Sequence, residues 1–375
     1  MHTKRNVFIA VFSFLILTIF VLYGTYYYIL DKQKILLDST YNLTNTNILK
    51  LTEKFLDNKI NTTLAIALSL VKDYELHKLM ATQEYDKFNY NDISQQIKDN
   101  TKFKNIWIQI IDKEGNSIYR SWTDKKGDNL FFRKDLKNFV EDKKVSTSIS
   151  VGLYSMTIKA RAPIIDEENN FLGALEIISQ FNSIANDLKE NKIDSVIIAD
   201  KKYNEIIQLP FSKIFIDDYY VANVNVNKEL ITYLQRNKIE KYLKINNYII
   251  ENNYLISKFD LYNNKNERLG YILNFVKLND IDIRIVESFK IQTIMISAIV
   301  LIIMLFLFLI YLYTSYLRLL KIQENKKEAI LNSQENIIVI TLGNEIIDAN
   351  QRLYDFFINT KDLESFKKTY KCICS

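Results

Sequence analysis

Two long apolar stretches, separated by a large segment of mixed composition, constrain this chain more than any other feature. The first, residues 7–30, reads VFIAVFSFLILTIFVLYGTYYYIL, and the second, residues 291–317, reads IQTIMISAIVLIIMLFLFLIYLYTSYL. Each matches the length of roughly 20 apolar residues that crosses a bilayer as a helix. Both end in tyrosine clusters of the kind that anchor a helix at the membrane interface. We therefore predict two transmembrane helices and no third.

The basic residues beside these stretches predict how the chain crosses the membrane. Lys4 and Arg5 precede the first stretch, and several more follow the second: Arg318, Lys321, Lys326 and Lys327. Lysine and arginine close to a span stay on the cytoplasmic side. We therefore expect both termini to be cytoplasmic and residues 31–290 to be extracytoplasmic. The net charge is only +5 and the lysines are dispersed, which argues against a nucleic-acid partner.

Residues with the chemistry of catalysis are scarce. The chain has two histidines, His2 and His77, and two cysteines, Cys372 and Cys374. That leaves almost nothing from which to build a zinc site, a Ser-His-Asp triad or the phospho-accepting histidine of a kinase. We predict no catalytic residue, no metal and no cofactor, and we expect the cysteines to be bystanders in a reducing compartment. An enzyme is the least favoured class.

A long helix is expected after the first span. Residues 31–80 contain no glycine or proline, and apolar residues recur at spacings of four and three from Leu37 to Phe55, with a stripe that then drifts along residues 56–71. Such a seam is typical of a coiled coil. It fits two structures equally well. One is a helix that packs on its own domain, and the other is a stalk that forms a homodimer together with the transmembrane helices.

Beyond this helix, the period of the apolar residues changes to that of strands separated by turns. Residues 106–112, IWIQIID, and residues 117–122 form a predicted hairpin. A helix is predicted next, followed by three more strands: 132–144 for the helix, and 145–151, 156–165 and 171–178 for the strands. These patterns predict an α+β fold with antiparallel sheets.

The same landmarks then return in the same order. Residues 110–118, IIDKEGNSI, are echoed by residues 198–206, IADKKYNEI. Residues 170–175, NFLGAL, are echoed by residues 267–272, ERLGYI. In both copies an aspartate ends one strand and a Leu-Gly pair opens the last one. We interpret this as two similar modules in tandem.

Alternation along the strands places polar side chains on one face of the first module. Arg120 shares a strand face with Trp122, and Lys159 shares one with Arg161. A guanidinium suits a carboxylate, and a tryptophan or tyrosine wall can cover an aliphatic body or stack on a cation. Nearby carboxylates could receive an ammonium, so the predicted ligand is a small carboxylate or an amino acid. The predicted ligand-binding residues are Arg120, Trp122, Asp124, Asp128, Tyr154, Lys159, Arg161 and Glu176.

These residues also have a structural explanation, which stays open. Arg120 and Arg161 fit solvent-exposed strand faces, and Trp122 fits hydrophobic packing. Residues 124–128 fit a turn in which Gly127 supplies an unusual backbone angle. The hypothesis to be examined is that the Arg120/Trp122 face and the Lys159/Arg161 face converge on one site.

A membrane-anchored long helix followed by two sheet modules and a second span resembles the double Cache sensor domains of bacterial transmembrane receptors. The resemblance covers most of residues 31–290. It rests on an ordered set of motifs: IQIIDKEGNSIYRSWTDKKGDNL, RKDLKNFV and SISVGLYSMTIKARAPIIDEENNFLGALEI. The resemblance implies a ligand site in the first, membrane-distal module. The second module has no counterpart of YRSWTDKKGDNL or GLYSMTIKARAPI.

The segment after the second span resembles the opening of a PAS domain. Residues 328–350 read EAILNSQENIIVITLGNEIIDAN, which predicts a lead-in helix, a strand at 337–342, a Gly343-Asn344 turn, a strand at 345–348 and the start of a helix. A PAS domain needs about a hundred residues to bury its sheet, so we expect an incomplete one here. The chain would then be the sensory fragment of a truncated or frameshifted receptor, such as a histidine kinase or a diguanylate cyclase, or would act through a cytoplasmic signalling protein.

Together these features predict a multi-pass receptor of the bacterial cytoplasmic membrane that takes part in signal transduction. The expected order is a cytoplasmic tail, a transmembrane helix, a stalk helix, a membrane-distal and a membrane-proximal module, a second transmembrane helix, a linker helix and an incomplete PAS domain: 1–6, 7–30, 31–80, 81–195, 196–290, 291–317, 318–333 and 334–375. The alternative class is a non-enzymatic membrane-anchored binding or adhesion protein. Such a protein would have no need of an ordered helix after the second span.

Overall fold

The computed structural model describes residues 2–104, 106–343, 345–358 and 360–370. The chain divides into two compact units, one of residues 35–285 and one of residues 1–34 together with 286–375. Cys372 and Cys374, which the sequence singled out, lie outside the described residues.

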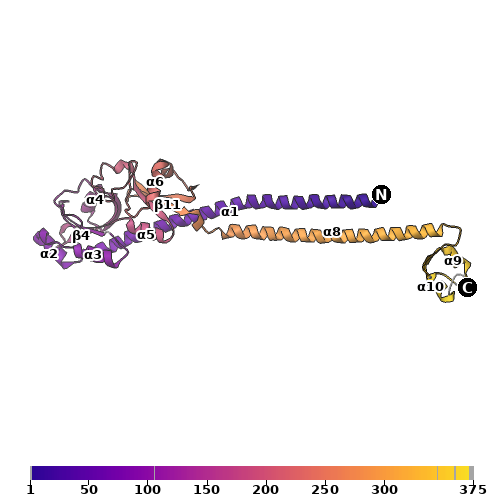
Figure 1. Cartoon of the computed structure of the whole chain (residues 1–375). Coiled ribbons are helices and arrows are strands. Elements are labelled where there is room, and N and C mark those ends of the chain that lie inside the picture. Colours follow the sequence, from indigo (N-terminus) through magenta and orange to yellow (C-terminus); the bar gives the residue numbers. More distant parts are fainter. Residues whose placement is uncertain (1, 105, 344, 359, 371–375) are drawn as a thin grey trace. The chain divides into compact units, whose positions relative to one another are not determined.

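Helix α1 (His2–Leu70) opens the chain and contributes to both units (Figure 1). It contains no proline, which would break the hydrogen-bond ladder. The helix that we expected to reach residue 80 ends at Leu70. The chain turns there, and Asp73 caps a new helix, α2 (Tyr74–Thr82), by accepting a hydrogen bond from the N–H of Glu75 at 3.1 Å. An aspartate in this position gives the backbone a fresh helix start, which the apolar pattern does not reveal.

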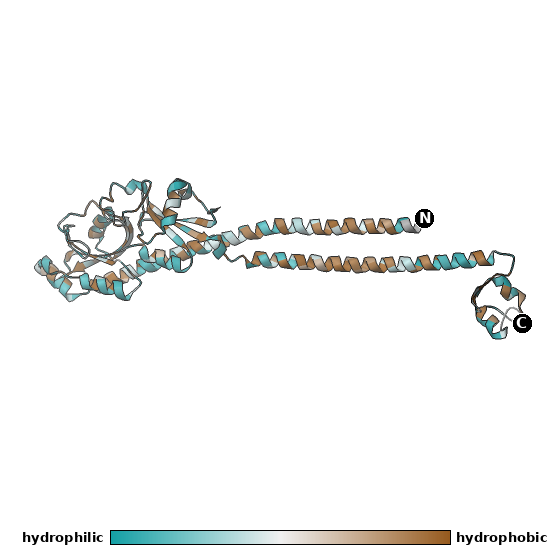
Figure 2. Ribbon diagram, viewed as in Figure 1, coloured by the Kyte–Doolittle hydropathy of each residue, from teal (hydrophilic) through white to brown (hydrophobic). Residues whose placement is uncertain are grey.

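The unit formed by the two ends of the chain holds the first part of α1 and helix α8 (Arg284–Asn332). Both helices are long and apolar enough to cross a membrane, with 18-residue windows of mean hydropathy 2.6 and 3.1, and Figure 2 shows these apolar runs in brown. The rings of Phe14 and Phe308 stack with centroids 4.3 Å apart, and the hydroxyl of Thr25 donates to that of Ser297 at 3.0 Å. The two candidate membrane helices are thus present as predicted.

In the unit of residues 35–285, the second half of α1 packs on both sheets described below. Ile48 and Leu56 are buried in one core cluster and Ala67 in another. The helix is also hydrogen-bonded to the sheet: the side chain of Asn274 donates to the buried hydroxyl of Thr52 at 3.1 Å. The apolar stripe is therefore used for packing inside the chain, which is the first of the two structures that it fitted.

The first sheet has five antiparallel strands in the order β2-β1-β5-β4-β3. The strands are β1 (Ile106–Asp112), β2 (Ser117–Arg120), β3 (Ser146–Val151), β4 (Met156–Ile165) and β5 (Phe171–Ser179). Three short helices accompany them: η1 (Tyr85–Lys87), α3 (Asn91–Asn100) and α4 (Lys134–Asp142).

One face of this sheet is apolar. Ile108 of β1, Ala160 of β4 and Ile177 of β5 are fully buried and pack in one cluster with Leu76 of α2 and Ala67 of α1. The predicted alternation along β4 is confirmed, since its apolar residues lie in core clusters while Thr157, Lys159 and Arg161 alternate with them. The opposite face is therefore left for the polar side chains.

The return strand expected at 117–122 is shorter than predicted. β2 ends at Arg120, and Ser121 and Trp122 form a turn. The hydroxyl of Ser121 accepts the hydrogen bond of the Ile108 N–H at 2.9 Å and so replaces the strand carbonyl that would continue the ladder. Trp122 therefore lies outside the strand that was predicted to include it, but its ring stays on the same side as Arg120, 6.0 Å from the guanidinium.

The second sheet has four antiparallel strands in the order β6-β11-β10-β9. They are β6 (Asp194–Ala199), β9 (Tyr248–Glu251), β10 (Tyr254–Tyr262) and β11 (Arg268–Lys277). The remaining elements of this unit are α5 (Asn182–Glu190), η2 (Lys201–Tyr203), β7 (Phe215–Ile216), β8 (Tyr219–Tyr220), α6 (Lys228–Arg236), α7 (Glu240–Leu243) and η3 (Leu278–Asp280). The order β1-β5-β4-β3 of the first sheet is the same arrangement, which supports the predicted duplication.

The Leu-Gly pair that opens the last strand has the same role in both sheets. Gly173 pairs with Asp112, and Gly270 pairs with Ala199. A Cβ atom on Gly173 would lie 2.2 Å from the carbonyl oxygen of Ile111, and one on Gly270 would lie 2.1 Å from that of Ile198. Only a residue without a side chain allows the neighbouring strand to come this close. The sequence echo therefore marks equivalent contacts in the two modules.

After α8 the chain forms a small hairpin and two helices: β12 (Val339–Leu342), β13 (Glu345–Ala349), α9 (Gln351–Phe356) and α10 (Leu363–Thr369). Asn350 is fully buried between β13 and α9 and accepts a hydrogen bond from the Ile338 N–H at 2.9 Å. Strand, strand and helix follow one another as predicted for residues 337–350. The predicted turn includes Asn344, which lies outside the described residues.

Candidate ligand site

Two rows of residues cross the polar face of the first sheet. The strand register places one row side by side as Arg120, Gln109, Glu176 and Arg161. Two residues further along, a second row consists of Trp107, Ile178 and Lys159. Residues two apart on a strand point to the same face, so four strands deliver these side chains to one surface.

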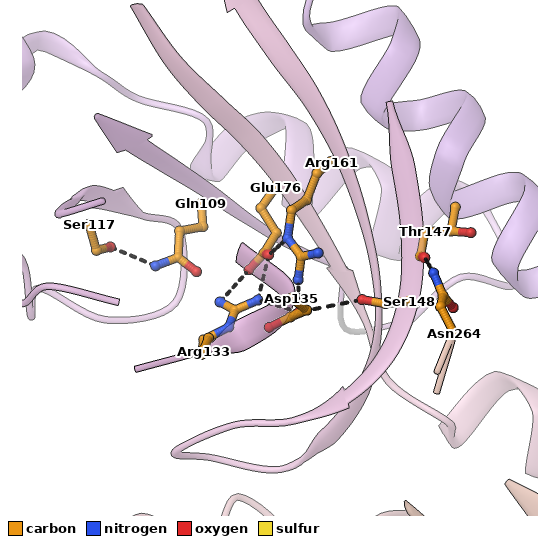
Figure 3. Close-up of polar contacts among 9 residues, drawn as sticks. All are labelled: Gln109, Ser117, Arg133, Asp135, Thr147, Ser148, Arg161, Glu176 and Asn264. Carbon is orange, nitrogen blue, oxygen red and sulfur yellow. Dashed lines mark hydrogen bonds and ion pairs between the residues drawn. The ribbon is translucent and has the colours of Figure 1, made fainter. Parts of the chain in front are cut away.

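Glu176 is held between two arginines in this surface (Figure 3). Arg133, the residue before α4, donates to both carboxylate oxygens, at 2.9 Å from Nη1 and 2.7 Å from Nη2. Arg161 donates through Nε to the same carboxylate and through Nη2 to Asp135 of α4. We call Arg133, Asp135, Arg161 and Glu176 the Glu176 network. It joins the first turn of α4 to β4 and β5.

The network keeps its carboxylates ionised. Burial opposes the charge of Glu176, but Arg133 and Arg161 outweigh this effect and lower its pKa to about 2. Against the same opposition from burial, the two arginines lower the pKa of Asp135 well below its usual range. Two cations and two anions compensate each other, so the network forms a neutral, internally bonded wall.

Arg120 is also occupied within the chain. Its Nη1 and Nη2 donate to the two oxygens of Asp128 at 2.7 and 2.8 Å, and Nη1 donates to the carbonyl of Lys125 at 2.8 Å. Gln109 lies between Arg120 and Glu176, and the amide orientation that satisfies both has its oxygen accepting from Arg120 Nε, 3.1 Å away, and its nitrogen donating to Glu176 Oε1, 3.3 Å away. The guanidinium fork that we expected to bind a ligand carboxylate instead fixes the loop that carries Asp128.

Lys159 is the exception among these charges. Its side chain is buried, with 3% exposure, yet Nζ makes no hydrogen bond or ion pair to any residue that the structure describes. Burial, and after it the nearby Arg133, lower the pKa of Lys159 to about 7. Four cations therefore face three carboxylates on this surface, since Arg120, Arg133 and Arg161 are matched by Asp128, Asp135 and Glu176. One positive charge has no counterpart in the described chain.

A cavity of about 430 Å³ opens over the two rows, and we call it the tryptophan cavity. The residues that define it are Trp107, Arg120, Trp122, Asp128, Tyr154 and Lys159. The rings of Trp107 and Trp122 stack with centroids 4.7 Å apart, and Tyr154 lies edge-on to Trp122 at 6.1 Å. The indole Nε1 of Trp122 is buried without a hydrogen-bond partner among the described residues. The cavity thus combines an aromatic wall with polar groups that have unused donors.

The second module closes one side of this cavity. Glu205, Ile206 and Gln208 belong to its lining, and we call residues 205–211 the bridging segment. Its backbone is bonded to the first module, since the N–H groups of Leu209 and Phe211 donate to the carbonyls of residues 153 and 154 at 3.0 and 2.8 Å. An adjoining cavity of about 570 Å³ lies beneath these apolar side chains and shares both tryptophans. The site is therefore built by both modules.

Comparisons with known proteins give likeness of fold only. No protein-family model and no curated protein matches the chain. The chain is similar to the sensor domain of the histidine kinase DctB of V. cholerae, with 13% identity, a TM-score of 0.38, and coverage of 63% of this chain and 96% of that one. It is also similar to the ligand-binding domain of the Campylobacter jejuni chemoreceptor Tlp3 in complex with L-valine, with 11% identity, a TM-score of 0.39, and coverage of 66% and 97%.

A third similar structure is the E. coli DcuS sensor domain, at 15% identity and a TM-score of 0.31, with coverage of 36% of this chain and 98% of that one. At these TM-scores the likenesses assign no function to the chain. A functional assignment has to come from the residues of its own cavity.

The structure brings together five of the eight residues that the sequence indicated: Arg120, Trp122, Asp128, Tyr154 and Lys159. Arg161 and Glu176 lie in the Glu176 network, and Arg161 borders a separate cavity of about 630 Å³ beside α4 and β3. Asp124 is exposed on the loop and lines neither cavity. The solvent-exposed strand faces considered for Arg120 and Arg161 are wrong, because both side chains are buried.

Four residues of the site were missed from the sequence: Trp107, Gln109, Arg133 and Asp135. Trp107 and Gln109 could have been found, because they occupy alternate positions in IWIQIID, where a glutamine interrupts an otherwise apolar strand. Arg133 and Asp135 had no comparable signal at the start of a helix. Among the described residues, no group of three or more histidine, cysteine, aspartate or glutamate side chains could hold a metal ion.

Proposed function

We propose that the chain is a transmembrane receptor that binds a small carboxylate, of the organic-acid or amino-acid type, in the tryptophan cavity. The observation that carries this proposal is Lys159, a buried cation without a partner at the wall of a cavity of ligand size. A buried charge that is not paired within the protein destabilises it, so its presence in a cavity favours a role in binding an anion.

The aromatic wall supports the same function. Trp107 and Trp122 present a stacked apolar surface beside Lys159, and Tyr154 extends it. A carboxylate bound to Lys159 would have its hydrocarbon part against these rings, where burial of apolar area adds to the affinity. The neutral Glu176 network and the Arg120–Asp128 pair keep the wall in place beneath the ligand.

We further propose the membrane arrangement predicted from the sequence. The unit of residues 35–285 would lie outside the cytoplasmic membrane of a bacterium, with both termini inside and α8 leading to a PAS-like segment. Binding would be passed to a cytoplasmic signalling protein or to an output module, and the receptor would act as a homodimer through faces of α1 and α8 not used for internal packing. In this proposal the chain itself catalyses no reaction.

Binding can be tested with the full chain in lipid nanodiscs. Its only two tryptophans, Trp107 and Trp122, line this cavity and the adjoining one, so tryptophan emission reports on this region of the protein. We expect at least one member of a panel of small carboxylates to change the emission and raise the unfolding temperature, and Lys159→Met to weaken that binding at least about tenfold. Lys258→Met, in the equivalent strand β10 of the second sheet, should bind like the wild type. Equal affinity in the wild type and in Lys159→Met would reject the proposed site.

Topology has a separate test. The chain has cysteines only at positions 372 and 374, so a membrane-impermeant maleimide should leave the protein unlabelled in intact cells and label it after permeabilisation. Lys126→Cys, made together with Cys372→Ser and Cys374→Ser, places one thiol on the exposed loop of the first module and should be labelled without permeabilisation. The reverse pattern would contradict the proposed orientation.

A further inference from the structure

Several hydrogen-bond donors of the residues that line the tryptophan cavity have no acceptor within the part of the chain that the structure describes. Lys159 Nζ has no hydrogen bond or ion pair in the described chain, and the buried Trp122 Nε1 and Arg133 Nε of two other lining residues also lack a partner there. Arg133 is itself only 8% exposed, although its other two nitrogens are bonded to Glu176 and Asp135. Buried donors without acceptors destabilise a protein unless a ligand satisfies them. The cavity therefore calls for a ligand that is rich in acceptor oxygens.

The buried and half-buried carboxylates around the cavity are already paired with arginines of the chain. Both oxygens of Asp128 accept hydrogen bonds from Arg120, and Glu176 accepts from Arg133 and Arg161 and has no exposed surface. One further carboxylate, Glu205, belongs to the lining, but it is exposed at the rim. An ion pair at such a position contributes little to affinity in water. Among the described residues, a ligand ammonium would find no carboxylate here that is not already paired with an arginine or exposed at the rim.

The charge balance of this surface also indicates which net charge the ligand carries. With Lys159 protonated, the surface carries one positive charge in excess, so a monoanion would neutralise it and a dianion would leave one negative charge over. A zwitterionic amino acid would leave the excess unchanged and would bring an ammonium close to Lys159 and Arg133. Burying that second cation without a partner carries a penalty of several kcal/mol.

The rest of the cavity indicates the body of the ligand. The stacked rings of Trp107 and Trp122 continue into the adjoining cavity, where Leu209, Pro210 and Phe211 of the bridging segment complete an apolar lining. A branched or aromatic hydrocarbon group fits this surface, and a second charged group does not.

We propose, on the basis of the proposed function above, that the tryptophan cavity selects a monocarboxylate with an additional uncharged acceptor oxygen and an apolar body. A 2-oxo or 2-hydroxy acid has this chemistry, and the amino acid of the same carbon skeleton is disfavoured. The carboxylate pairs with Lys159, the keto or hydroxyl oxygen accepts from the indole of Trp122, and the hydrocarbon part lies against the rings. Trp122 is thereby a specificity-determining residue.

The test uses matched ligands on the full chain in lipid nanodiscs, read by tryptophan emission and by the unfolding temperature. The first pair is 4-methyl-2-oxopentanoate and L-leucine, which share a skeleton, and succinate serves as the dianion. We expect the oxo acid to bind at least about tenfold more tightly than L-leucine or succinate. Trp122→Phe keeps an aromatic ring but removes the donor, so it should weaken the binding of the oxo acid about fivefold.

Each other outcome has a definite meaning. Binding of L-leucine as tightly as the oxo acid overturns this inference and leaves the proposed function standing. Loss of that leucine affinity in Glu205→Gln would identify the rim carboxylate as the ammonium partner. If no 2-oxo acid of three to six carbons binds below about 10 mM, the inference is also overturned. The proposed function then survives only where another carboxylate binds the wild type more tightly than Lys159→Met.

Discussion

Lys159→Met is expected to make the ligand-free protein more stable. Most substitutions of buried residues destabilise, but this one removes a charge that lies among Arg133 and Arg161 without a partner in the described chain. Methionine has a similar length and no charge, so it can fill the same space beside β4. A gain in stability together with a loss of carboxylate binding would show that the lysine is kept for binding.

The magnitude follows from the lowered pKa. The pKa of Lys159 falls from 10.5 when exposed to about 7 in the folded protein, which at about 1.4 kcal/mol for each pH unit gives an upper bound of about 5 kcal/mol. A cavity of this size admits water near Nζ, so we take about half, roughly 2 kcal/mol. For a unit of this length, that corresponds to an increase of about 4–8 °C in the unfolding temperature.

The sign of the pH dependence adds a second criterion. Below about pH 7 the lysine is charged in both the folded and unfolded states, so the full difference between variant and wild type is present. Between about pH 7 and 10 the unfolded chain binds a proton that the folded chain has released, and the wild type gains stability as the pH rises. The advantage of Lys159→Met should therefore shrink across this window. The groups near Nζ that set this behaviour are Arg133 and Arg161 as cations and Asp135 and Glu176 as anions.

Thermal unfolding of the full chain, followed by tryptophan emission at pH 6, 7, 8 and 9, measures both effects. Lys258→Met is the control, because Lys258 is nearly as buried on β10 but is paired with Asp260 at 3.3 Å and donates to the carbonyl of Leu243 at 3.2 Å. Its removal should lower stability by about 1 kcal/mol. If Lys159→Met lowers stability in the same way, Lys159 has a partner in the folded protein and the charge count at the cavity is wrong.

Three further predictions concern the Glu176 network and the two sheets. Arg161→Met should destabilise the protein by about 3 kcal/mol in chemical denaturation, because it leaves buried carboxylates without one of their cations. Arg268→Met, which removes one partner of a half-exposed ion pair, should change the stability by less than about 1 kcal/mol. Because the pKa of Glu176 falls from 4.5 to about 2 on folding, the stability it contributes is complete only above pH 4.5 and is lost as the pH falls toward 2. An acid titration of tryptophan emission should show this loss, and Glu176→Gln should remove it. Gly173→Ala and Gly270→Ala should each destabilise the protein by at least about 2 kcal/mol, since both meet a carbonyl oxygen of the next strand. A large effect at only one of them would contradict the equivalence of the two sheets.

The sequence predicted the elements of the fold better than the contacts of the site. Strand alternation placed Lys159 and Arg161 on one face of β4, and the sheet confirms it. Their different roles depend on which residue stands opposite each of them, and that depends on strand register. Arg161 faces Glu176 across β4 and β5, whereas Lys159 faces Ile178. A step of two residues along the same pair of strands therefore separates a satisfied arginine from an unpartnered lysine, and no local pattern in the sequence reveals which residue stands opposite each.

The errors have a common physical cause. The side chain of Ser121 accepts a backbone N–H where β2 ends, and that of Asp73 accepts one where a new helix begins, so β2 and α1 are shorter than the apolar pattern predicts. Arg133 escaped notice because a charged residue before a helix is usual on a surface, and only the packing of α4 against the sheet buries it beside Glu176. Both kinds of error arise from tertiary contacts that the periodicity of a single segment does not contain.

The bridging segment gives the cavity a physical route to the second module. A ligand that contacts Tyr154 touches the loop whose carbonyl accepts the N–H of Phe211, and the hydroxyl of Tyr220 in β8 bonds Ser155 of the same loop at 3.2 Å. Ligand binding alters the second module only if the position of this loop differs between the free and bound states, because a ligand shifts an equilibrium by its difference in affinity for the two. Apolar ligands that reach Phe211 in the adjoining cavity should therefore couple more strongly than small ones that contact Lys159 alone. Hydrogen exchange at Leu209 and Phe211, compared between 2-oxopropanoate and 4-methyl-2-oxopentanoate at saturation, would separate binding from coupling, since equal protection by both would place the coupling elsewhere.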